Sequence, residues 1–318
     1  MTEQGARVAR KVARRLRIHL ENVDALGAIA RLLFKLSGLY GIGVRNALDV
    51  QVRFLELPFE DLPPAFDGYR ILHLSDLHID GLDGLTEVLL DKLRGLETDL
   101  TVITGDFRSR FHGDGSEALR RLERLVPGIR ARDGVFGVQG NHDNPGFLPG
   151  VEATGVVLLR NRAVRIGRGL DEIWLAGVDD PHLYETADLE AALDGVPEGA
   201  FTILLAHSPE LFRPAAERGI RLYLCGHTHG GQIHLPGIGP VFMNARVPRR
   251  YGVGLWREGR MWGYTTFGAG STAVPVRLGC KPEVVIFTLR RCKAQRAAVQ
   301  APGAVLPDRV GSSLETCV

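Results

Sequence analysis

Five short apolar runs in this 318-residue chain each end in a block of glycine, aspartate, asparagine or histidine residues. The runs and their blocks are Ile71–Leu74 before Ser75–His78, Leu100–Thr104 before Gly105-Asp106, Val135–Val138 before Gly140–Asp143, Ile203–Ala206 before His207, and Leu222–Cys225 before Gly226–His229. Short apolar runs bounded by turn residues are typical of buried strands. Since ligands bind outside the carboxyl ends of strands in open α/β sheets, the pattern predicts an α/β fold with a polar site along one edge.

Helical patterns separate these strands, which favours layers of helices around central sheets. The expected helices are Leu85–Gly95, Ser116–Leu125, Asp188–Leu193 and Pro209–Arg218, and residues 250–289 are read as strands and turns. A hydrophobic content of 45% is enough for a sizeable core. We therefore expect one domain over residues 46–291, followed by a flexible tail over 292–318.

The charge is unevenly distributed along the chain. Residues 1–20 hold six basic side chains and one acidic side chain, so they carry +5 within a total of +2, and the remainder carries −3. Because the body has no long basic stripe, nucleic-acid binding is not expected. Within Arg7–Leu20, apolar residues recur every four positions among arginines, which predicts a basic amphipathic helix. Such a helix favours contact with an anionic membrane surface.

Residues 25–44 are mostly apolar and long enough to span a bilayer. Arg31 and Lys35 lie in the middle, however, and each costs about 2.5–3.5 kcal/mol at the centre of a membrane helix. We therefore expect residues 1–45 to lie on the membrane surface, so that the protein is cytoplasmic and peripheral on the inner membrane. The alternative is packing on the chain's own domain or on another subunit, which leaves the oligomeric state open.

The polar blocks supply the chemistry expected of a metal centre. Seven of their residues offer carboxylate, amide or imidazole ligands: Asp76, His78, Asp106, Asn141, His207, His227 and His229. No cysteine belongs to the blocks, and the four cysteines form no C-x-x-C pair, so a thiolate zinc site is not indicated. These ligand types suit Mn, Fe or Zn. Seven ligands exceed the needs of one ion and can hold two if one carboxylate bridges them, as in two-metal phosphoryl chemistry.

The motifs Asp-x-His, Gly-Asp, Gly-Asn-His-Asp, a lone His and Gly-His-Thr-His occur in this order between residues 70 and 232. In this the chain resembles the calcineurin-like metallophosphoesterase family. The resemblance implies a four-layer α/β/β/α sandwich. It also implies that Asp76, His78, Asp106 and His229 hold one divalent ion, while Asp106, Asn141, His207 and His227 hold the other, with Asp106 as the bridge.

The same resemblance implies roles for residues that are not ligands. His142 would contact the phosphate and protonate the leaving oxygen, which is general-acid work suited to imidazole. Asp143 would either orient His142 or cap a turn. Arg108, Arg110 and His182 would bind a second phosphate, or else they are solvated loop residues.

The residues around the motifs bear on the substrate. Phe-Arg-Ser-Arg follows Gly105-Asp106, where protein serine/threonine phosphatases have Asp-Arg-Gly. The blocks Gly226–Ile233 and Gly177–Pro181 resemble a bacterial membrane-associated branch, some members of which cleave UDP-2,3-diacylglucosamine in lipid A synthesis. We therefore expect hydrolysis of a phosphodiester or pyrophosphate by metal-activated hydroxide, with this UDP-linked acylated sugar as the first candidate. The alternatives are a nucleotide or glycerophospho-phosphodiesterase, or a non-catalytic scaffold, against which the filled ligand positions argue.

Overall fold

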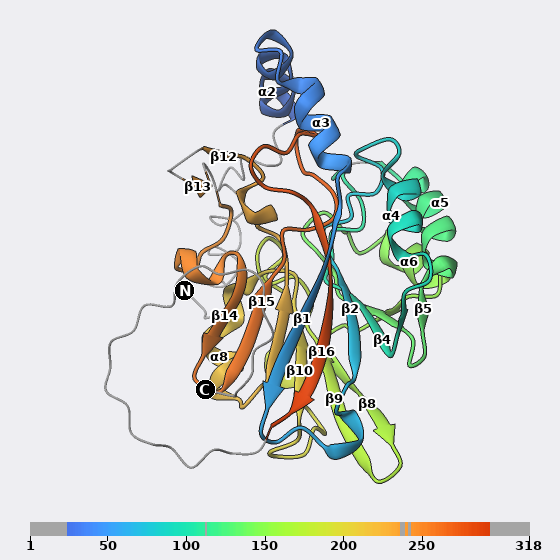
Figure 1. Cartoon of the computed structure of the whole chain (residues 1–318), viewed down its shortest axis with the longest axis vertical. Coiled ribbons are helices and arrows are strands. Elements are labelled where there is room, and N and C mark those ends of the chain that lie inside the picture. The colour runs from blue at the N-terminus through green and yellow to red at the C-terminus, as the bar shows by residue number, and fades with distance from the viewer. Residues whose placement is uncertain (1–23, 112, 236–238, 241–242, 293–318) are drawn as a thin grey trace, which may run out of the picture.

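Two six-stranded mixed sheets lie face to face in the computed structural model, which describes residues 24–111, 113–235, 239–240 and 243–292 (Figure 1). The first sheet has the order β1 (Gln51–Phe59), β16 (Glu283–Arg291), β2 (Arg70–Leu74), β4 (Leu100–Ile103), β6 (Val135–Gly137), β7 (Val157–Leu158). The second has the order β14 (Gly254–Glu258), β15 (Met261–Thr265), β11 (Leu222–Cys225), β10 (Thr202–Leu205), β9 (Asp171–Gly177), β8 (Arg162–Arg168).

Both faces of the central strands are buried, which explains why these strands appear in the sequence as continuous apolar runs. Ile71 of β2 and Ile203 of β10 point into the core between the sheets. Leu72 and Leu204, the next residues along each strand, point outward into the cores beneath the helices. This alternation follows from the two-residue period of a strand, and it gives each sheet two apolar faces to cover.

Helices cover the outer face of each sheet, so the layers run α/β/β/α as expected. The first sheet packs against α4 (Leu85–Leu93), α5 (Ser116–Leu125) and α6 (Leu148–Ala153), and the second against α7 (Leu189–Ala192) and α8 (Phe212–Glu217). Figure 1 shows α4 to α6 and α8 on opposite sides of the sheets. Short strand pairs, β3 (Glu97–Thr98) with β5 (Arg130–Ala131) and β12 (His234–Leu235) with β13 (Gly239–Pro240), lie outside the two large sheets.

Helices α2 (Asp24–Leu36) and α3 (Tyr40–Leu48) stand at one end of the molecule (Figure 1). Hydrogen bonds join α3 to the segment after β15: the Arg277 backbone N–H donates to the Gly43 carbonyl at 3.0 Å, and Asn46 Nδ2 donates to the Arg277 carbonyl at 3.0 Å. Within the described residues, no single helix is long and apolar enough to cross a membrane. Gly27–Leu36 and Tyr40–Leu48 reach that length only as a pair bent by 112°. The predicted helix at Arg7–Leu20 and the tail beyond residue 292 lie outside the described residues.

Candidate metal centre

The carboxyl ends of five strands converge at one edge of the two sheets. Strands β2, β4 and β6 are parallel neighbours in the first sheet, and β10 and β11 are parallel neighbours in the second. The polar blocks follow these ends directly, so each sheet contributes side chains to the same region. The strand order therefore brings the polar blocks together at one edge of the sheets, as the sequence predicts.

Two groups of acidic and imidazole side chains form there, and all of their members are buried. In the first group, one ligand atom from each of Asp76, His78, Asp106 and His229 lies within 4.8 Å of the others. In the second group the same holds for Asp106, His207 and His227, so Asp106 belongs to both. Asn141 Oδ1 lies 2.8 Å from His207 Nε2, which adds an amide oxygen beside the second group. Six of the seven predicted ligands thus form two groups that share the Asp106 carboxylate, and the seventh, Asn141, lies beside the second group.

Five of the seven ligands have left-handed backbone conformations that residues other than glycine rarely adopt. Asp76, His78, Asp106, His227 and His229 have φ values of 49°, 36°, 54°, 72° and 51°. Each such residue costs of order 1–3 kcal/mol, which the surrounding structure must offset. The Asp76 N–H donates to the Gly105 carbonyl at 3.0 Å, and the His78 N–H donates to the Asp106 carbonyl at 2.9 Å. These bonds hold the loops after β2 and β4 against each other in the strained shape.

Backbone carbonyls fix which imidazole nitrogens are available to an ion. His78 Nδ1 lies 3.0 Å from the Arg108 carbonyl, and His207 Nδ1 lies 2.7 Å from the Thr104 carbonyl. A carbonyl can only accept, so Nδ1 carries a proton in both rings and Nε2 is the nitrogen available to an ion, which on His207 would replace a proton. Such carbonyl partners are typical of metal-binding histidines.

The free lone pairs then face other electron-pair donors. The Asp106 Oδ2 atom lies 3.4 Å from His78 Nε2 and 3.3 Å from His207 Nε2. His78 Nε2 and His229 Nε2 lie 3.2 Å apart, as do His207 Nε2 and His227 Nδ1. Buried acceptors that face one another are unfavourable unless a cation or a proton lies between them. The residues present therefore fit two divalent ions.

Electrostatics keep most of these groups in their ligand forms. Burial lowers the pKa of His78 to about 4 and holds the pKa values of His227 and His229 well below the usual range, so their imidazoles are neutral. Burial opposes charge on His207 as well, but the neighbouring Asp106 carboxylate raises the pKa of His207 to about 10. Despite its own burial, Asp106 has a pKa well below its usual range because of the imidazoles of His207 and His142. The shared carboxylate is therefore ionised, as a bridging ligand must be.

His142 lies beside the shared carboxylate with its ring at the site. Its Nδ1 lies 2.6 Å from the Ser109 carbonyl, and its Nε2 lies 3.9 Å from Asp106 Oδ2. Asp143 instead faces backbone amides: its carboxylate accepts hydrogen bonds from Asp106 N at 2.8 Å, Phe107 N at 3.0 Å and Gly140 N at 2.9 Å. Of the two roles expected for Asp143, the hydrogen bonds favour the turn cap, which fixes the loop that carries Asp106.

The three residues expected to bind a second phosphate lie in different surroundings. Arg108 is buried, and its guanidinium donates to the carbonyls of His142 at 2.9 Å and Gly113 at 3.1 Å, so the expected phosphate contact is corrected to a structural one. Arg110 is exposed on the same loop. His182 is buried, with its ring centroid 4.2 Å from that of His227 and its Nδ1 2.7 Å from Glu210 Oε1. His182 thus lies directly beside the second ligand group.

Arg277 is a buried residue of the site that sequence reasoning missed. Its guanidinium donates to the carbonyls of Phe267 at 2.7 Å and Gly268 at 3.2 Å, and its Nη2 lies 3.3 Å from Nδ1 of the ligand His229. It thus braces the loop behind the first ligand group. The residue belongs to no motif, and a single arginine between apolar residues gave no signal of this role.

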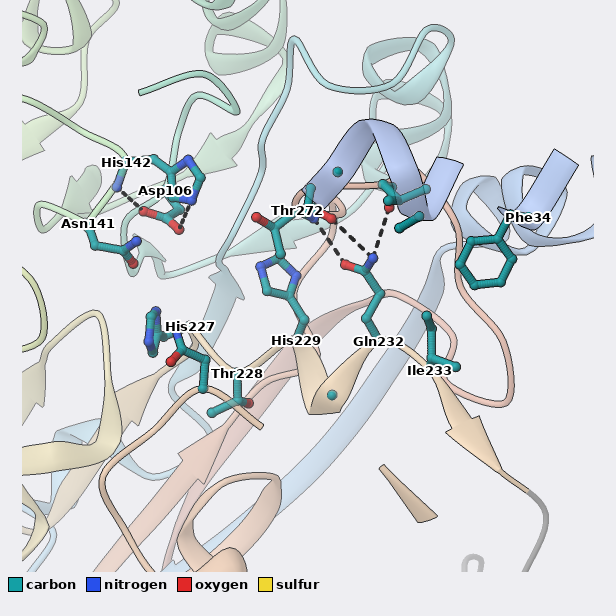
Figure 2. A pocket seen from close by; sticks show the side chains of 16 residues that line it. Phe34, Asp106, Asn141, His142, His227, Thr228, His229, Gln232, Ile233 and Thr272 are labelled. Atoms are coloured by element: carbon teal, nitrogen blue, oxygen red, sulfur yellow. Dashed lines mark hydrogen bonds and ion pairs between the residues drawn. The ribbon is translucent and has the colours of Figure 1, made fainter. Parts of the chain in front are cut away.

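A pocket of about 340 Å³ opens onto the metal centre (Figure 2). Asp106, Asn141, His142, His227 and His229 line its inner side. Figure 2 shows Phe34, from α2, on the side opposite Asn141 and His227. The candidate ligands therefore face a space that can admit a substrate.

The four-layer fold and the two ligand groups with a shared carboxylate define a binuclear metal hydrolase. The chain belongs to the calcineurin-like phosphoesterase family, whose profile matches residues 69–231. With both ligand groups intact, it is a metal-dependent phosphoesterase.

Three relatives illustrate its place in the family. The uncharacterized metallophosphoesterase YkuE of Bacillus subtilis is 32% identical, with 72% of this chain and 82% of the relative covered. The phosphodiesterase YaeI of Escherichia coli is 30% identical, with 70% and 82% covered. A bovine transmembrane protein with a metallophosphoesterase domain is 32% identical, and the match covers 78% of this chain but only 59% of that protein. The narrower resemblance to UDP-2,3-diacylglucosamine pyrophosphatases finds no support among these relatives.

Proposed function

We propose that this chain hydrolyses a phosphodiester or pyrophosphate at a membrane surface, using two divalent ions held by the seven ligands. The observation that carries the proposal is the position of the Asp106 carboxylate, which is common to both ligand groups. Asp76, His78, Asp106 and His229 would hold one ion, and Asp106, Asn141, His207 and His227 the other. When bound, the ions would lower the pKa of a shared water and neutralise phosphate oxygens.

The protein's own contribution to the reaction is positioning and proton transfer. The Asp143 carboxylate accepts hydrogen bonds from the backbone N–H groups of Asp106 and Gly140. It therefore fixes the position of the Asp106 loop relative to the loop that bears His142. His142 donates Nδ1–H to the Ser109 carbonyl, so a protonated ring carries its second proton at Nε2, on the side that faces Asp106. From Nε2 the proton passes to the leaving oxygen, which is the role of a general acid.

Hydrolysis of bis-p-nitrophenyl phosphate with added Mn²⁺ tests this assignment. Because p-nitrophenolate leaves readily without a proton, His142→Ala should lower kcat by about 10²- to 10⁴-fold for a diester with an alkyl leaving group and by less for bis-p-nitrophenyl phosphate, while the purified protein still binds two ions. Asp106→Asn is the matched comparison, because it should lose both activity and metal. If the wild type hydrolyses no diester with any divalent ion, the chain is a scaffold and the enzyme assignment fails.

The proposed membrane contact rests on the exposed side of α2 and α3. Four large apolar side chains of α2 are exposed by 55 to 76%: Ile29, Leu32, Leu33 and Leu36. Arg31 and Lys35 lie among them and are also exposed. Apolar side chains beside basic ones suit an anionic interface, and we place the protein on the cytoplasmic side of the inner membrane.

Sedimentation with vesicles that contain anionic lipid tests the contact. Leu33→Ser combined with Leu36→Ser should weaken binding and leave hydrolysis of soluble diesters unchanged. Leu170→Ser is the control, because Leu170 is fully exposed on the turn between β8 and β9, away from α2. Equal vesicle binding by the double variant and the wild type would contradict the proposed surface.

The substrate proposal is UDP-2,3-diacylglucosamine, which would be cleaved at its pyrophosphate in lipid A synthesis. A turnover screen should compare it with cyclic and linear nucleotides and with glycerophosphodiesters, since a relative carries the name phosphodiesterase. Metal analysis of the same preparation would show whether Mn, Fe or Zn occupies the two sites. Turnover of a nucleotide or glycerophosphodiester in preference to the sugar would replace the proposed substrate.

A further inference from the structure

The pocket at the metal centre has one polar side and one apolar side. The polar side consists of the candidate ligands and His142. Away from them, the lining includes Ala30 and Phe34 from α2, Ile233 after the Gly-His-Thr-His block, and Ala273 and Val274 from the loop before Arg277. An apolar wall beside a few convergent polar groups is typical of a pocket that binds a small molecule. The lining thus offers a substrate polar groups on one side and apolar surface on the other.

Close packing holds helix α2 over this apolar side. Gly27 faces the loop so closely that an added Cβ would lie 3.2 Å from the Ala273 carbonyl oxygen. On α3, a Cβ at Gly43 would lie 2.6 Å from the Val276 Cβ, so the backbone of this helix also touches the loop. Two glycines at points of contact allow both helices to rest on one segment. Helix α2 is therefore a fixed part of the pocket wall.

Gln232, a polar side chain of the pocket lining, has its hydrogen bonds used within the protein. Gln232 Nε2 donates to the carbonyls of Thr272 at 3.1 Å and Val274 at 2.9 Å, and Gln232 Oε1 accepts from Thr272 N at 3.0 Å (Figure 2). These bonds shape the loop and leave this amide with little capacity for a ligand. The wall between Phe34 and Val274 thus offers a substrate mainly apolar surface.

We infer that this wall is a subsite for the hydrocarbon part of an amphiphilic phosphoester whose phosphate lies at the metal-binding residues. The inference rests on the proposed phosphodiesterase activity and adds that Phe34, Ala30, Ile233 and Val274 select for a chain attached near the scissile phosphate. It makes α2 part of the active site, because Phe34 faces the pocket while Leu33, its neighbour in sequence, is 60% exposed.

Two diesters with the same leaving group test the subsite. Methyl p-nitrophenyl phosphate and hexyl p-nitrophenyl phosphate both release p-nitrophenolate when water attacks phosphorus, and they differ only in the alkyl group that remains. Burial of each methylene should raise kcat/KM roughly two- to fourfold. The hexyl ester should therefore be preferred by about 30-fold or more. Calorimetric binding of hexylphosphonate and methylphosphonate gives the same comparison without turnover.

Variants of α2 in the full-length protein assign the effect to the pocket. Phe34→Ala should reduce the ratio of kcat/KM for the hexyl ester to that for the methyl ester to below about fivefold. Leu33→Ala, on the exposed side of the same helix, should keep the full preference. Ala30→Phe narrows the pocket and should also lower the ratio of kcat/KM for the hexyl ester to that for the methyl ester, which provides a second test if Phe34→Ala loosens the helix.

The possible results separate this inference from the proposed function. Hydrolysis of both esters at equal rates would overturn the hydrocarbon subsite and leave the phosphodiesterase activity intact. Hydrolysis of neither ester would remove the activity itself. If Leu33→Ala and Phe34→Ala lose the preference for the hexyl ester equally, that preference arises at the outer surface of α2. The assignment of the subsite to the pocket would then be wrong.

Discussion

Gly226 provides the sharpest test of how backbone packing builds the metal centre. It lies between β11 and the ligand His227, and a Cβ placed on it would be 2.1 Å from Asp76 Oδ2 and 2.1 Å from Ser75 Oγ. The backbone of Gly226 has no left-handed φ, so alanine fits its conformation. The effect of Gly226→Ala should therefore come from collision with the side chains of Asp76 and Ser75 and not from backbone strain.

The size of the effect follows from the contact distance. Ordinary van der Waals contact begins at 3.4 Å, so the Asp76 carboxylate must move by about 1.3 Å. A metal ligand tolerates a deviation of about 0.2 Å. Disturbing the groups that orient a metal ligand weakens metal affinity by about 10- to 100-fold. Overpacking by an added methyl group costs about 1–3 kcal/mol of folding stability. His227 should be disturbed too, because its N–H donates to Asp76 at 3.0 Å.

Metal titration by calorimetry, with the metal content of the purified protein and denaturant unfolding, measures both effects. Gly226→Ala should bind the ion of the Asp76 group at least tenfold more weakly, with a smaller loss at the group that contains His227. Gly167→Ala is the matched control, because a Cβ there meets nothing within 4 Å. It should match the wild type in all three measurements. Two ions bound by Gly226→Ala with wild-type affinity and unchanged stability would refute this account of the site.

Two further predictions concern buried charge. Burial lowers the pKa of His73 to about 3, so below about pH 6.5 the unfolded chain binds a proton that the folded chain does not, and stability falls by about 1.4 kcal/mol per pH unit. His73→Leu should remove that slope from urea unfolding between about pH 6.5 and 4.5, and equal slopes would contradict the prediction. Arg277→Met should cost about 1–3 kcal/mol because it leaves buried carbonyls without donors. Arg124→Met, which removes a surface ion pair with Glu87, should change stability much less, and similar losses in the two variants would contradict the bracing role.

The parts of the fold that local patterns determine could be predicted from the sequence. Helix α5 spans Ser116–Leu125 as expected, because its apolar and charged residues separate cleanly onto two faces. The central strands are buried on both faces, so they appear as apolar runs. Strand β8 gave no such signal: it lies at an edge, and of its residues only Ile166 is buried. It is recognised only by its antiparallel pairing with β9 across the two-residue turn Gly169-Leu170.

The candidate site likewise has features that could be predicted from the sequence and features that could not. The strand-end blocks were visible because parallel strands bring their carboxyl ends to one edge, and residue types alone indicated a metal. The left-handed backbone at Asp76 and His229 could not be predicted, because it depends on loops from distant strands. The same holds for Arg277, whose side chain reaches His229 across 48 positions of sequence, and for Phe34, which reaches the pocket only through the docking of α2.

The position of β16 has a consequence for the order in which the protein matures. This strand is the last in the described chain, yet it lies between β1 and β2, pairing in parallel with the former and antiparallel with the latter. The segment just before it supports a ligand loop, since the Ala269 N–H donates to the Ser75 carbonyl at 3.0 Å. On the ribosome, the first sheet stays open, and the Asp76 loop lacks this support, until the segment from residue 269 to the end of β16 has emerged. We therefore expect the Asp76 ligand group to take its final form only after the whole domain has been synthesised.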